Sequence, residues 1–174
     1  MIQGLSLTWN NYHFPFSTFN FQPSIFHYLC RMQISCSEKE LSIIKKIASA
    51  AGSLELDCFL IGGFVRDKLL GRETKDADFV CTGDATELAT AAARLFDPAP
   101  RVDYFKNFGT AHFRLADGFD IEFVGARKES YQRDSRKPAV VPGSIKDDQD
   151  RRDFTINAMA ISLQAADFGN LNDP

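Results

Sequence analysis

The chain has 174 residues, which is enough for one domain with a hydrophobic core, and its apolar and charged fractions are ordinary for a globular protein. The net charge of −3 excludes an overall basic field that would attract nucleic acid, so a site for a polyanion must be local or lie outside this chain. No apolar run approaches the ~20 residues that a membrane helix needs, and we expect no membrane partner.

The cysteines bear on the redox environment and on metal binding. They are Cys30, Cys36, Cys58 and Cys81, and no two of them form a CxxC pair, which argues against a zinc site. Cys58 and Cys81 lie in apolar runs and are expected to be small buried hydrophobes. The pattern predicts a reduced, cytoplasmic protein without a disulfide framework.

The beginning of the chain differs in composition from the rest. Residues 1–36 are rich in Phe, Asn, Ser and Tyr, carry little charge, and lack the basic region and compact apolar core of a signal peptide. We predict that this segment is a disordered extension and that residues 37–174 form the domain. An alternative hypothesis is that translation starts at Met32.

The first predicted helix follows a capping box, in which Ser37 and Glu40 stand three residues apart. Apolar residues then recur at helical spacing as far as Gly52, which we expect to end the helix. The apolar run over 56–61 predicts a short strand directly after it.

Helices and strands continue to alternate in the next part of the chain. Residues 64–71 (FVRDKLLG) predict a short helix that ends at its glycine, and 76–81 (DADFVC) predict a strand. Asp84, with Glu87 three residues on, begins an alanine-rich helix that we expect to run through Leu95.

The second half of the chain reads mainly as strands. Three are predicted, over 102–106, 110–116 and 119–124. The last two are joined as a hairpin across Asp117-Gly118. The polar stretch Arg127–Ser144 predicts a loop, and residues 145–163 begin as a helix and end as a strand. These elements predict an α/β (α+β) fold, a mixed sheet with an antiparallel hairpin flanked by helices.

Two acids interrupt the predicted strand 76–81. Asp76 and Asp78 point to the same face, because alternate residues of a strand share a face. Two carboxylates there repel each other, and a divalent cation between them explains the arrangement; oxygen ligands of this kind suit Mg²⁺. The alternative is an edge strand with one polar face.

Gly62 and Gly63 follow the strand 56–61 and open the next helix. Glycines let a ligand approach the backbone, and the helix N-terminus offers free N–H groups to an anion. Arg66, one turn into the helix, is placed to hold a phosphate. The alternative is a plain strand–turn–helix with a surface arginine.

A third acid and a second group of arginines lie further along the chain. Glu122 is flanked by apolar residues in its strand, but Asp120 shares its face, so spacing alone leaves open which of the two would reach a metal. The alternative for Glu122 is a solvent-facing position. The segment RRDFTINA (151–158) combines charges with apolar residues, so at least one of its polar side chains is expected to face inward.

Together these features predict transfer of a nucleotidyl group from a nucleoside triphosphate. Two Mg²⁺ ions would activate the attacking hydroxyl and stabilise the pyrophosphate leaving group, while the protein positions the reactants and stabilises charge.

Four blocks of sequence resemble a known family. They are IGGFVRDKLLGRETKDADFV, FGTA, IEFVGARKESY and DDQDRRDFTINAMAISL with the following GNLNDP, and they span about Phe59 to Pro174. They resemble, in order, the catalytic head of bacterial-type (class II) tRNA nucleotidyltransferases and their poly(A) polymerase relatives. The resemblance implies a polymerase-β-like nucleotidyltransferase fold that adds C, C and A from CTP and ATP to the 3′ end of tRNA without a template.

The resemblance also implies roles for individual residues. It implies that Asp76 and Asp78 bind the metal, that Glu122 is the third catalytic carboxylate, and that a further set of residues contacts or supports the nucleotide. That set is Gly62, Gly63, Arg66, Asp67, Arg152, Asp153 and Asn157. Arg127, which follows just past the strand that holds Glu122, is also predicted to bind the nucleotide.

The chain departs from the family in its length. Members continue into a neck, body and tail, whose Glu-Asp-x-x-Arg motif selects C or A and whose later domains hold the tRNA, whereas this chain stops at Pro174. We therefore expect it to need those domains for nucleotide selection and tRNA binding. The alternatives are a relative that adds only A, only CC or poly(A), a non-catalytic nucleotide-binding module, or a small stand-alone transferase, against which RRDFTINA argues.

Overall fold

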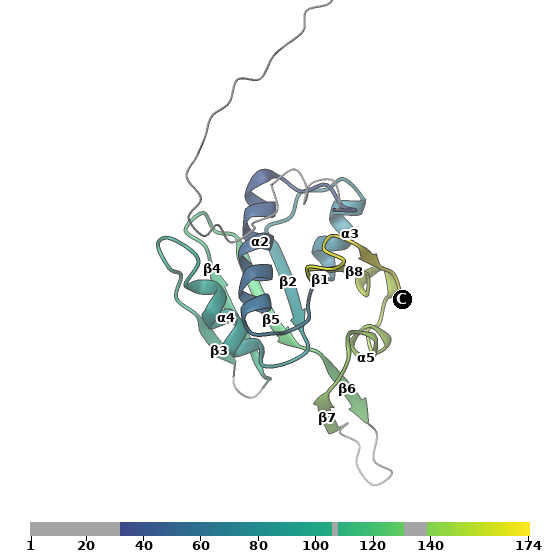
Figure 1. Ribbon diagram of the computed structural model, residues 1–174. Helices are drawn as coiled ribbons and strands as arrows, with labels where there is room; N and C mark the ends of the chain where they lie inside the picture. Colours follow the sequence, from purple (N-terminus) through teal and green to yellow (C-terminus); the bar gives the residue numbers. More distant parts are fainter. Residues whose placement is uncertain (1–31, 106–107, 131–138) are drawn as a thin grey trace, which may run out of the picture.

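The computed structural model describes residues 32–105, 108–130 and 139–174, and its centre is a seven-stranded mixed sheet (Figure 1). The strand order is β3-β4-β5-β2-β1-β8-β9. Only β2 and β5 pair in parallel, and the other neighbours are antiparallel. The strands are β1 (Cys58–Ile61), β2 (Asp76–Cys81), β3 (Asp103–Phe105), β4 (Thr110–Arg114), β5 (Asp120–Gly125), β8 (Ala160–Ser162) and β9 (Leu171–Asn172).

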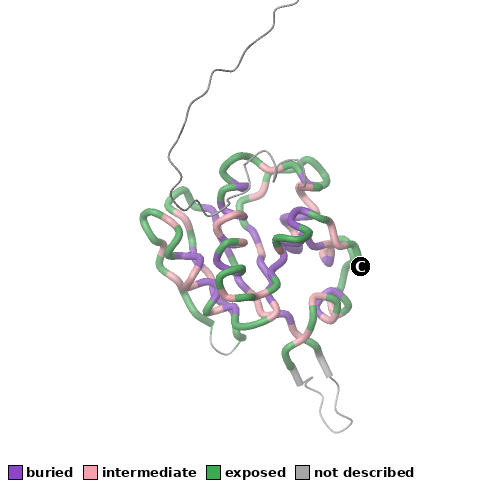
Figure 2. The backbone as a smooth tube through the Cα atoms, viewed as in Figure 1, coloured by how far each residue is buried: buried purple, intermediate pink, exposed green. Residues whose placement is uncertain are grey.

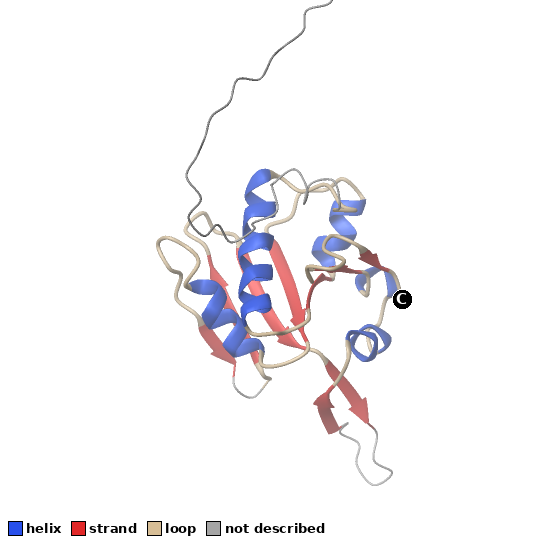
Figure 3. Cartoon of the chain, in the orientation of Figure 1, coloured by secondary structure: helices blue, strands red, loops and turns tan. Residues whose placement is uncertain are grey.

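Helices flank this sheet, as the sequence predicts (Figure 3). They are α2 (Glu38–Ser53), α3 (Gly63–Leu69), α4 (Ala85–Ala93), α5 (Ile145–Asp150) and the 3₁₀ helix η1 (Thr155–Asn157). Helices α2 and α4 pack against each other and cover one face of the sheet. None of the helices in the described ranges is long and apolar enough to cross a membrane.

Helix α2 shows how local chemistry sets an element. The Ser37 side chain accepts a hydrogen bond from the Glu40 backbone N–H, and the Glu40 carboxylate accepts one from the Ser37 N–H at 2.8 Å, so the predicted capping box is confirmed. The predicted end at Gly52 is one residue early, because the helix runs to Ser53 and its capping residue is Leu54. The turn that follows places Glu55 at φ 55°, so the left-handed residue of this terminus is not the glycine.

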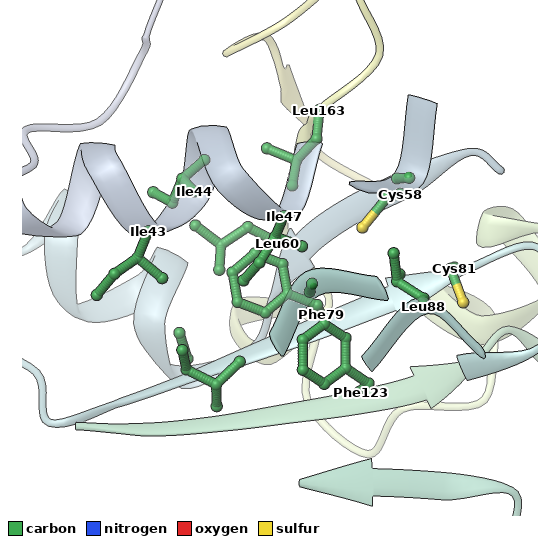
Figure 4. Packing of buried hydrophobic residues seen from close by; sticks show 14 of the residues in the cluster. Ile43, Ile44, Ile47, Cys58, Leu60, Phe79, Cys81, Leu88, Phe123 and Leu163 are labelled. Atoms are coloured by element: carbon green, nitrogen blue, oxygen red, sulfur yellow. The ribbon is translucent and has the colours of Figure 1, made fainter. Parts of the chain in front are cut away.

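The core lies between the sheet and its two long helices (Figure 4). Ile47 and Leu60 are fully buried there, and the rings of Phe79 and Phe123 lie with centroids 5.7 Å apart across the parallel pair β2–β5. Burying a side chain of this size stabilises the fold by roughly 1.5–3 kcal/mol. The helix-covered face therefore supplies most of the apolar burial.

The opposite face of the sheet is only partly covered, because Asp76 and Glu122 are exposed and Asp78 is half-buried; Figure 2 colours the backbone by burial. Ala77 and Phe79 of β2 point into the main core, whereas Asp78 and Val80 point the other way. Val80 belongs to a smaller apolar cluster that also contains Phe59, Ile61, Ala126 and Ala160, with Ile145 of α5 packed against it. This cluster covers one part of the face and leaves the acids beside it open.

The predicted loop Arg127–Ser144 is wrong in part. Strands β6 (Arg127–Ser130) and β7 (Ala139–Pro142) pair antiparallel as a separate two-stranded sheet that projects from the body (Figure 1). Pro142 pairs with Arg127 at the end of this ladder, where the missing N–H is tolerated. The polar composition and the prolines predicted a loop. The two strands were missed because they pair only with each other and do not join the main sheet. Pro138 lies outside the described residues.

The N-terminal boundary also differs from the expectation. Residues 1–31 of the predicted extension lie outside the described residues, but residues 32–36 pack on the domain. Ile34 is 5% exposed in the main core, and the Gln33 N–H donates to the Gly169 carbonyl at 3.0 Å. Residues 32–36 therefore belong to the packed domain.

The cysteines within the described ranges are free thiols. Cys58 and Cys81 are buried, as predicted, and Cys36 is half-buried; Cys30 lies outside those ranges. Burial raises the pKa of the Cys81 thiol to about 12, which keeps it protonated and unreactive.

Candidate active site

The acids of β2 and β5 lie beside each other because the two strands are parallel and in register. Asp78 is the Cα partner of Glu122, and Asp76 is the partner of Asp120. All four side chains point to the uncovered face, since Ala77 and Ile121 between them point into the core. Register therefore makes Glu122, and not Asp120, the neighbour of Asp78 on the adjacent strand.

Asp120 is already neutralised by β4. Arg114 donates two hydrogen bonds to its carboxylate, at 2.7 and 2.8 Å, and His112 Nε2 lies 2.8 Å from Asp120 Oδ1. The Arg114 guanidinium, assisted by His112, lowers the pKa of Asp120 below its ordinary value. Asp120 is thus bound in a surface ion pair, while Glu122 makes no salt bridge within the described residues.

Asp78 has the most perturbed environment of the acids. Partial burial, followed by the nearby charges of Glu122 and Asp76, raises the pKa of its carboxyl to about 6, and Arg152 opposes the shift. A carboxylate held among other carboxylates with little solvent is a favourable neighbour for a cation. Among the residues the structure describes, no three His, Cys, Asp or Glu side chains converge on one metal position. The donor set of Asp76 and Asp78 fits Mg²⁺, which commonly takes one or two carboxylates and completes its shell with water and substrate phosphates.

Gly62 allows the β1–α3 turn to approach Asp78. Its φ is 80°, and a Cβ at this position would lie 3.1 Å from Asp78 Oδ2 and 3.8 Å from an Arg152 guanidinium nitrogen. A side chain here would be strained and would crowd both groups. Gly63 begins α3, and a Cβ there would make only an ordinary 3.6 Å contact with Arg66.

Arg66 is held in one orientation by two neighbours. Its Nε and one terminal nitrogen donate to the Asp67 carboxylate at 2.9 and 2.8 Å, and its other terminal nitrogen donates to Asn157 Oδ1 at 2.8 Å. Asn157 lies in η1, which packs against α3. These contacts orient the guanidinium before any ligand binds, so little side-chain freedom remains to be lost on binding.

A buried carboxylate that sequence reasoning missed orients the second pair of arginines. Asp148 of α5 is 0% exposed and accepts hydrogen bonds from Arg151 at 3.0 and 2.6 Å and from Arg152 at 3.1 and 3.0 Å. Arg152 also donates to the Asn157 carbonyl at 3.4 Å. The signal was present as an acid three and four residues before two arginines, at the end of α5 and just beyond it, but the charge run suggested a solvated face.

These groups surround a cleft of about 380 Å³ on the uncovered face of the sheet. Six of the predicted site residues line it: Asp78, Glu122, Arg127, Arg152, Asp153 and Asn157. Arg151 and the 66% exposed Phe154, which the sequence analysis did not assign to the site, line it as well. The Arg127 Nε is buried without a hydrogen-bond partner in the described part of the chain, so this guanidinium is available to a ligand.

The other predicted residues lie around the cleft and not in its lining. Gly62, Gly63, Arg66 and Asp67 form the β1–α3 turn and helix, which are linked to the cleft through Asn157 and Arg152. Asp76 is exposed at the start of β2. The sequence thus predicted residues that lie close together in the structure, but not which of them line the cleft.

A mixed sheet that presents paired acids opposite oriented arginines defines a nucleotidyltransferase head, and comparison with known proteins agrees. The family model of the poly(A) polymerase head domain matches residues 58–174. The chain therefore belongs to the poly(A) polymerase head domain family, and the predicted fold class is confirmed.

Individual relatives sharpen this assignment. The chain is 48% identical over 118 residues to an A-adding tRNA nucleotidyltransferase from Aquifex aeolicus, which covers 68% of this chain and 14% of that protein. It matches an apo CCA-adding enzyme with a TM-score of 0.72 at 36% identity, over 86% of this chain and 34% of that one. It matches a tRNA nucleotidyltransferase complexed with a primer tRNA and an incoming ATP analog with a TM-score of 0.60 at 41% identity, over 74% and 34%. The chain spans about a third or less of these proteins.

Proposed function

We propose that this chain is the catalytic head of a template-independent nucleotidyltransferase that adds C, C and A from CTP and ATP to the 3′ end of tRNA. The observation that carries the proposal is the register of Asp78 with Glu122, which sets two acids side by side opposite oriented arginines. The names of the similar proteins support the reaction and its nucleic-acid substrate. A cytoplasmic location, predicted from the cysteines, stays a prediction.

The reaction would join the terminal hydroxyl of the RNA to the α-phosphorus of the nucleotide. A bond forms between the hydroxyl oxygen and phosphorus, the bond from this phosphorus to its bridging oxygen breaks, and pyrophosphate leaves with the electron pair. Asp76 and Asp78 would hold two Mg²⁺ ions, which supply charge neutralisation and lower the pKa of the hydroxyl. Glu122 lies on the side of Asp78 away from β1, and its carboxylate would take the hydroxyl proton there.

The arginines would bind the triphosphate. Arg66 and Arg152 are oriented by Asp67, Asn157 and Asp148, and Arg152 lines the cleft, so both guanidinium groups are fixed before a triphosphate binds. Charge-assisted hydrogen bonds from planar guanidinium groups are well suited to phosphate oxygens. The chain's own contribution is thus to hold the reactants and to stabilise the charge that develops on them.

Incorporation of labelled ATP and CTP into a tRNA that lacks its terminal nucleotides tests this proposal, in the longest natural protein that contains this chain. Asp76→Ala and Asp78→Ala are expected to abolish Mg²⁺-dependent incorporation, because each removes half of the metal ligand pair. Asp103→Asn, an exposed acid on the same face of the sheet, is the matched control and should leave incorporation unchanged. Substantial activity in either alanine variant would exclude the proposed role of the pair.

The main alternatives predict different products. A relative that adds only A, only CC or poly(A) would be identified by sequencing the RNA after reaction with each nucleotide alone and with both. A non-catalytic nucleotide-binding module would bind ATP or CTP with Mg²⁺ in calorimetry without incorporating either. The presence of both the acids and the oriented arginines favours catalysis over binding alone.

A further inference from the structure

The positions of Arg66 and Arg152 indicate the side from which an acceptor would approach. Asp78 has Ile61 of β1 as its partner on one side and Glu122 of β5 on the other. Arg66 and Arg152 lie on the β1 side, next to the turn that follows Ile61. In an in-line displacement the attacking oxygen and the leaving group stand on opposite sides of the phosphorus. With the leaving phosphates held at the arginines, the hydroxyl approaches across β5.

The floor of the cleft continues in that direction to the edge of the sheet. Val80 and Val124 line the cleft and are Cα partners, Val124 is the partner of Thr110 on β4, and Thr110 is the partner of Phe105 on β3. At one strand spacing per step, Phe105 lies about 10 Å from Val124. This row connects the candidate active site with an edge strand whose three residues are all exposed.

Phe105 faces the cleft side of the sheet. Its neighbour Tyr104 points to the opposite side, where its hydroxyl lies 3.0 Å from the Thr90 hydroxyl of α4, and alternate residues of a strand point in opposite directions. The Phe105 side chain is 50% exposed. The Phe108 N–H donates a hydrogen bond to the Phe105 carbonyl at 2.9 Å, and the Phe108 side chain is 70% exposed. Two large exposed rings therefore stand at the end of the row.

We infer that Phe105 and Phe108 form a stacking platform for the unpaired 3′ segment of the RNA that carries the attacking hydroxyl. This inference rests on the proposed function, because it takes the acceptor to be RNA. Aromatic rings bind successive bases of a single strand without reading their identity. Among the described residues beside the row, Arg114 and His112 are bound to Asp120, so stacking would supply much of the binding here.

Binding of a fluorescently labelled single-stranded RNA ending in ACC, followed by anisotropy with the 174-residue chain, tests the platform. Phe105→Ala and Phe108→Ala are each expected to raise the Kd by about tenfold, in the range for loss of one stacked base. The salt dependence of the Kd should stay the same, because no phosphate contact is removed. Tyr104→Ala is the matched control: it has similar exposure on the same strand but faces the helices, and it should leave the Kd unchanged.

A direct readout comes from placing an indole at the platform. In a Trp9→Phe background, which removes the only tryptophan of the chain, Phe105→Trp should lose fluorescence when the RNA is added, since a stacked base quenches indole. Tyr104→Trp in the same background should not respond to the RNA. This measurement does not depend on turnover, so it stays informative if the chain alone is inactive.

The outcomes separate this inference from the proposed function. Loss of RNA binding with unchanged ATP and CTP binding supports the platform. An unchanged Kd and an unquenched Phe105→Trp overturn the platform and leave the proposed function standing, whereas incorporation that survives Asp78→Ala overturns the function. Absence of any RNA binding by the chain also overturns the platform. A shift from dimer to monomer in sedimentation caused by Phe105→Ala, with RNA binding unaffected, would assign the edge of β3 to a second copy of the chain instead.

Discussion

The two faces of the central sheet differ in what their side chains do. On the face covered by α2 and α4, β2 and β5 contribute Phe79 and Phe123 to the hydrophobic core. On the other face, the same two strands present Asp78 and Glu122, whose carboxylates repel each other beside a half-open cleft. The side chains that stabilise the core and those that line the cleft thus lie on opposite faces of the same two strands. Substitutions on the two faces should therefore act in opposite directions.

The largest effect on stability is expected from the covered face. Phe123→Ala should lower the free energy of unfolding by about 3–5 kcal/mol, because it removes contacts with Phe79 and Phe113 and leaves a cavity. Denaturant unfolding followed by circular dichroism measures the change. Phe123→Leu, which retains much of the volume, serves as the control and should cost less. A loss below about 1 kcal/mol for Phe123→Ala would contradict the assignment of the core to this face.

A smaller loss of stability, together with a loss of function, is expected at the boundary of the cleft. Asp148→Ala should lower the free energy of unfolding by about 2 kcal/mol, because Arg151 and Arg152 lose their buried partner but remain partly hydrated. Released guanidinium groups should also raise the Kd for nucleotides by about tenfold, which calorimetry with ATP and Mg²⁺ would measure.

Asp148→Glu is the conservative variant that distinguishes charge from geometry at this position. It retains the carboxylate, so much of the stability should return, while the longer side chain shifts both arginines and should keep nucleotide binding weak. Full recovery of both properties would show that charge alone matters here. Unchanged nucleotide binding in Asp148→Ala would rule out the proposed orienting role.

The smallest effect has the opposite sign and belongs to the open face. Because the pKa of Asp78 is raised in the folded protein, ionisation of its carboxyl destabilises the fold. The stability that the protonated carboxyl gives is complete below the ordinary pKa near 4 and is lost as the pH rises through about 6. Asp78→Asn should therefore stabilise the metal-free protein at pH 7 by ~1–2 kcal/mol, which is less than the full shift implies because the cleft is open to solvent.

Thermal unfolding in the presence of a chelator, compared at about pH 3 and at pH 7, measures this gain. The variant and the parent should differ at pH 7 and converge near pH 3, where the Asp78 carboxyl is largely protonated in both states of the parent. Asp103→Asn on the same face should show no such pH dependence. A stability loss in Asp78→Asn at pH 7 would mean that the carboxylate is held by favourable partners and not by repulsive ones.

Periodicity was sufficient to predict the strand of the acid pair. Alternation within 76–81 predicted both the strand and the shared face of Asp76 and Asp78, because a two-residue period is the period of a β-strand, in which alternate side chains share a face. It could not choose between Asp120 and Glu122, since parity assigns a face but not a partner on the neighbouring strand. That choice required the register of β2 with β5, which depends on how the whole sheet assembles.

Burial of a charge was the feature that sequence reasoning could not reach. Asp148 stands in a run of charged residues and looks solvated, yet it is completely buried because two arginines close around it. Strands β6 and β7 were missed for a related reason, since they pair only with each other and carry no apolar alternation toward the core. In both cases the structure depends on a specific partner, which composition and period do not reveal.

The single parallel pairing of the sheet has a consequence for how the protein acquires its activity. Strands β2 and β5 are joined by a crossover through residues 82–119, so Asp78 and Glu122 meet only after α4, β3 and β4 are in place. A contact that closes so long a loop forms late in folding, because its entropic cost must be met before the contact contributes. On a ribosome, the cleft cannot exist until β5 has emerged. Nucleotide binding would then act as a final check on folding, since it stabilises only chains that have completed the crossover.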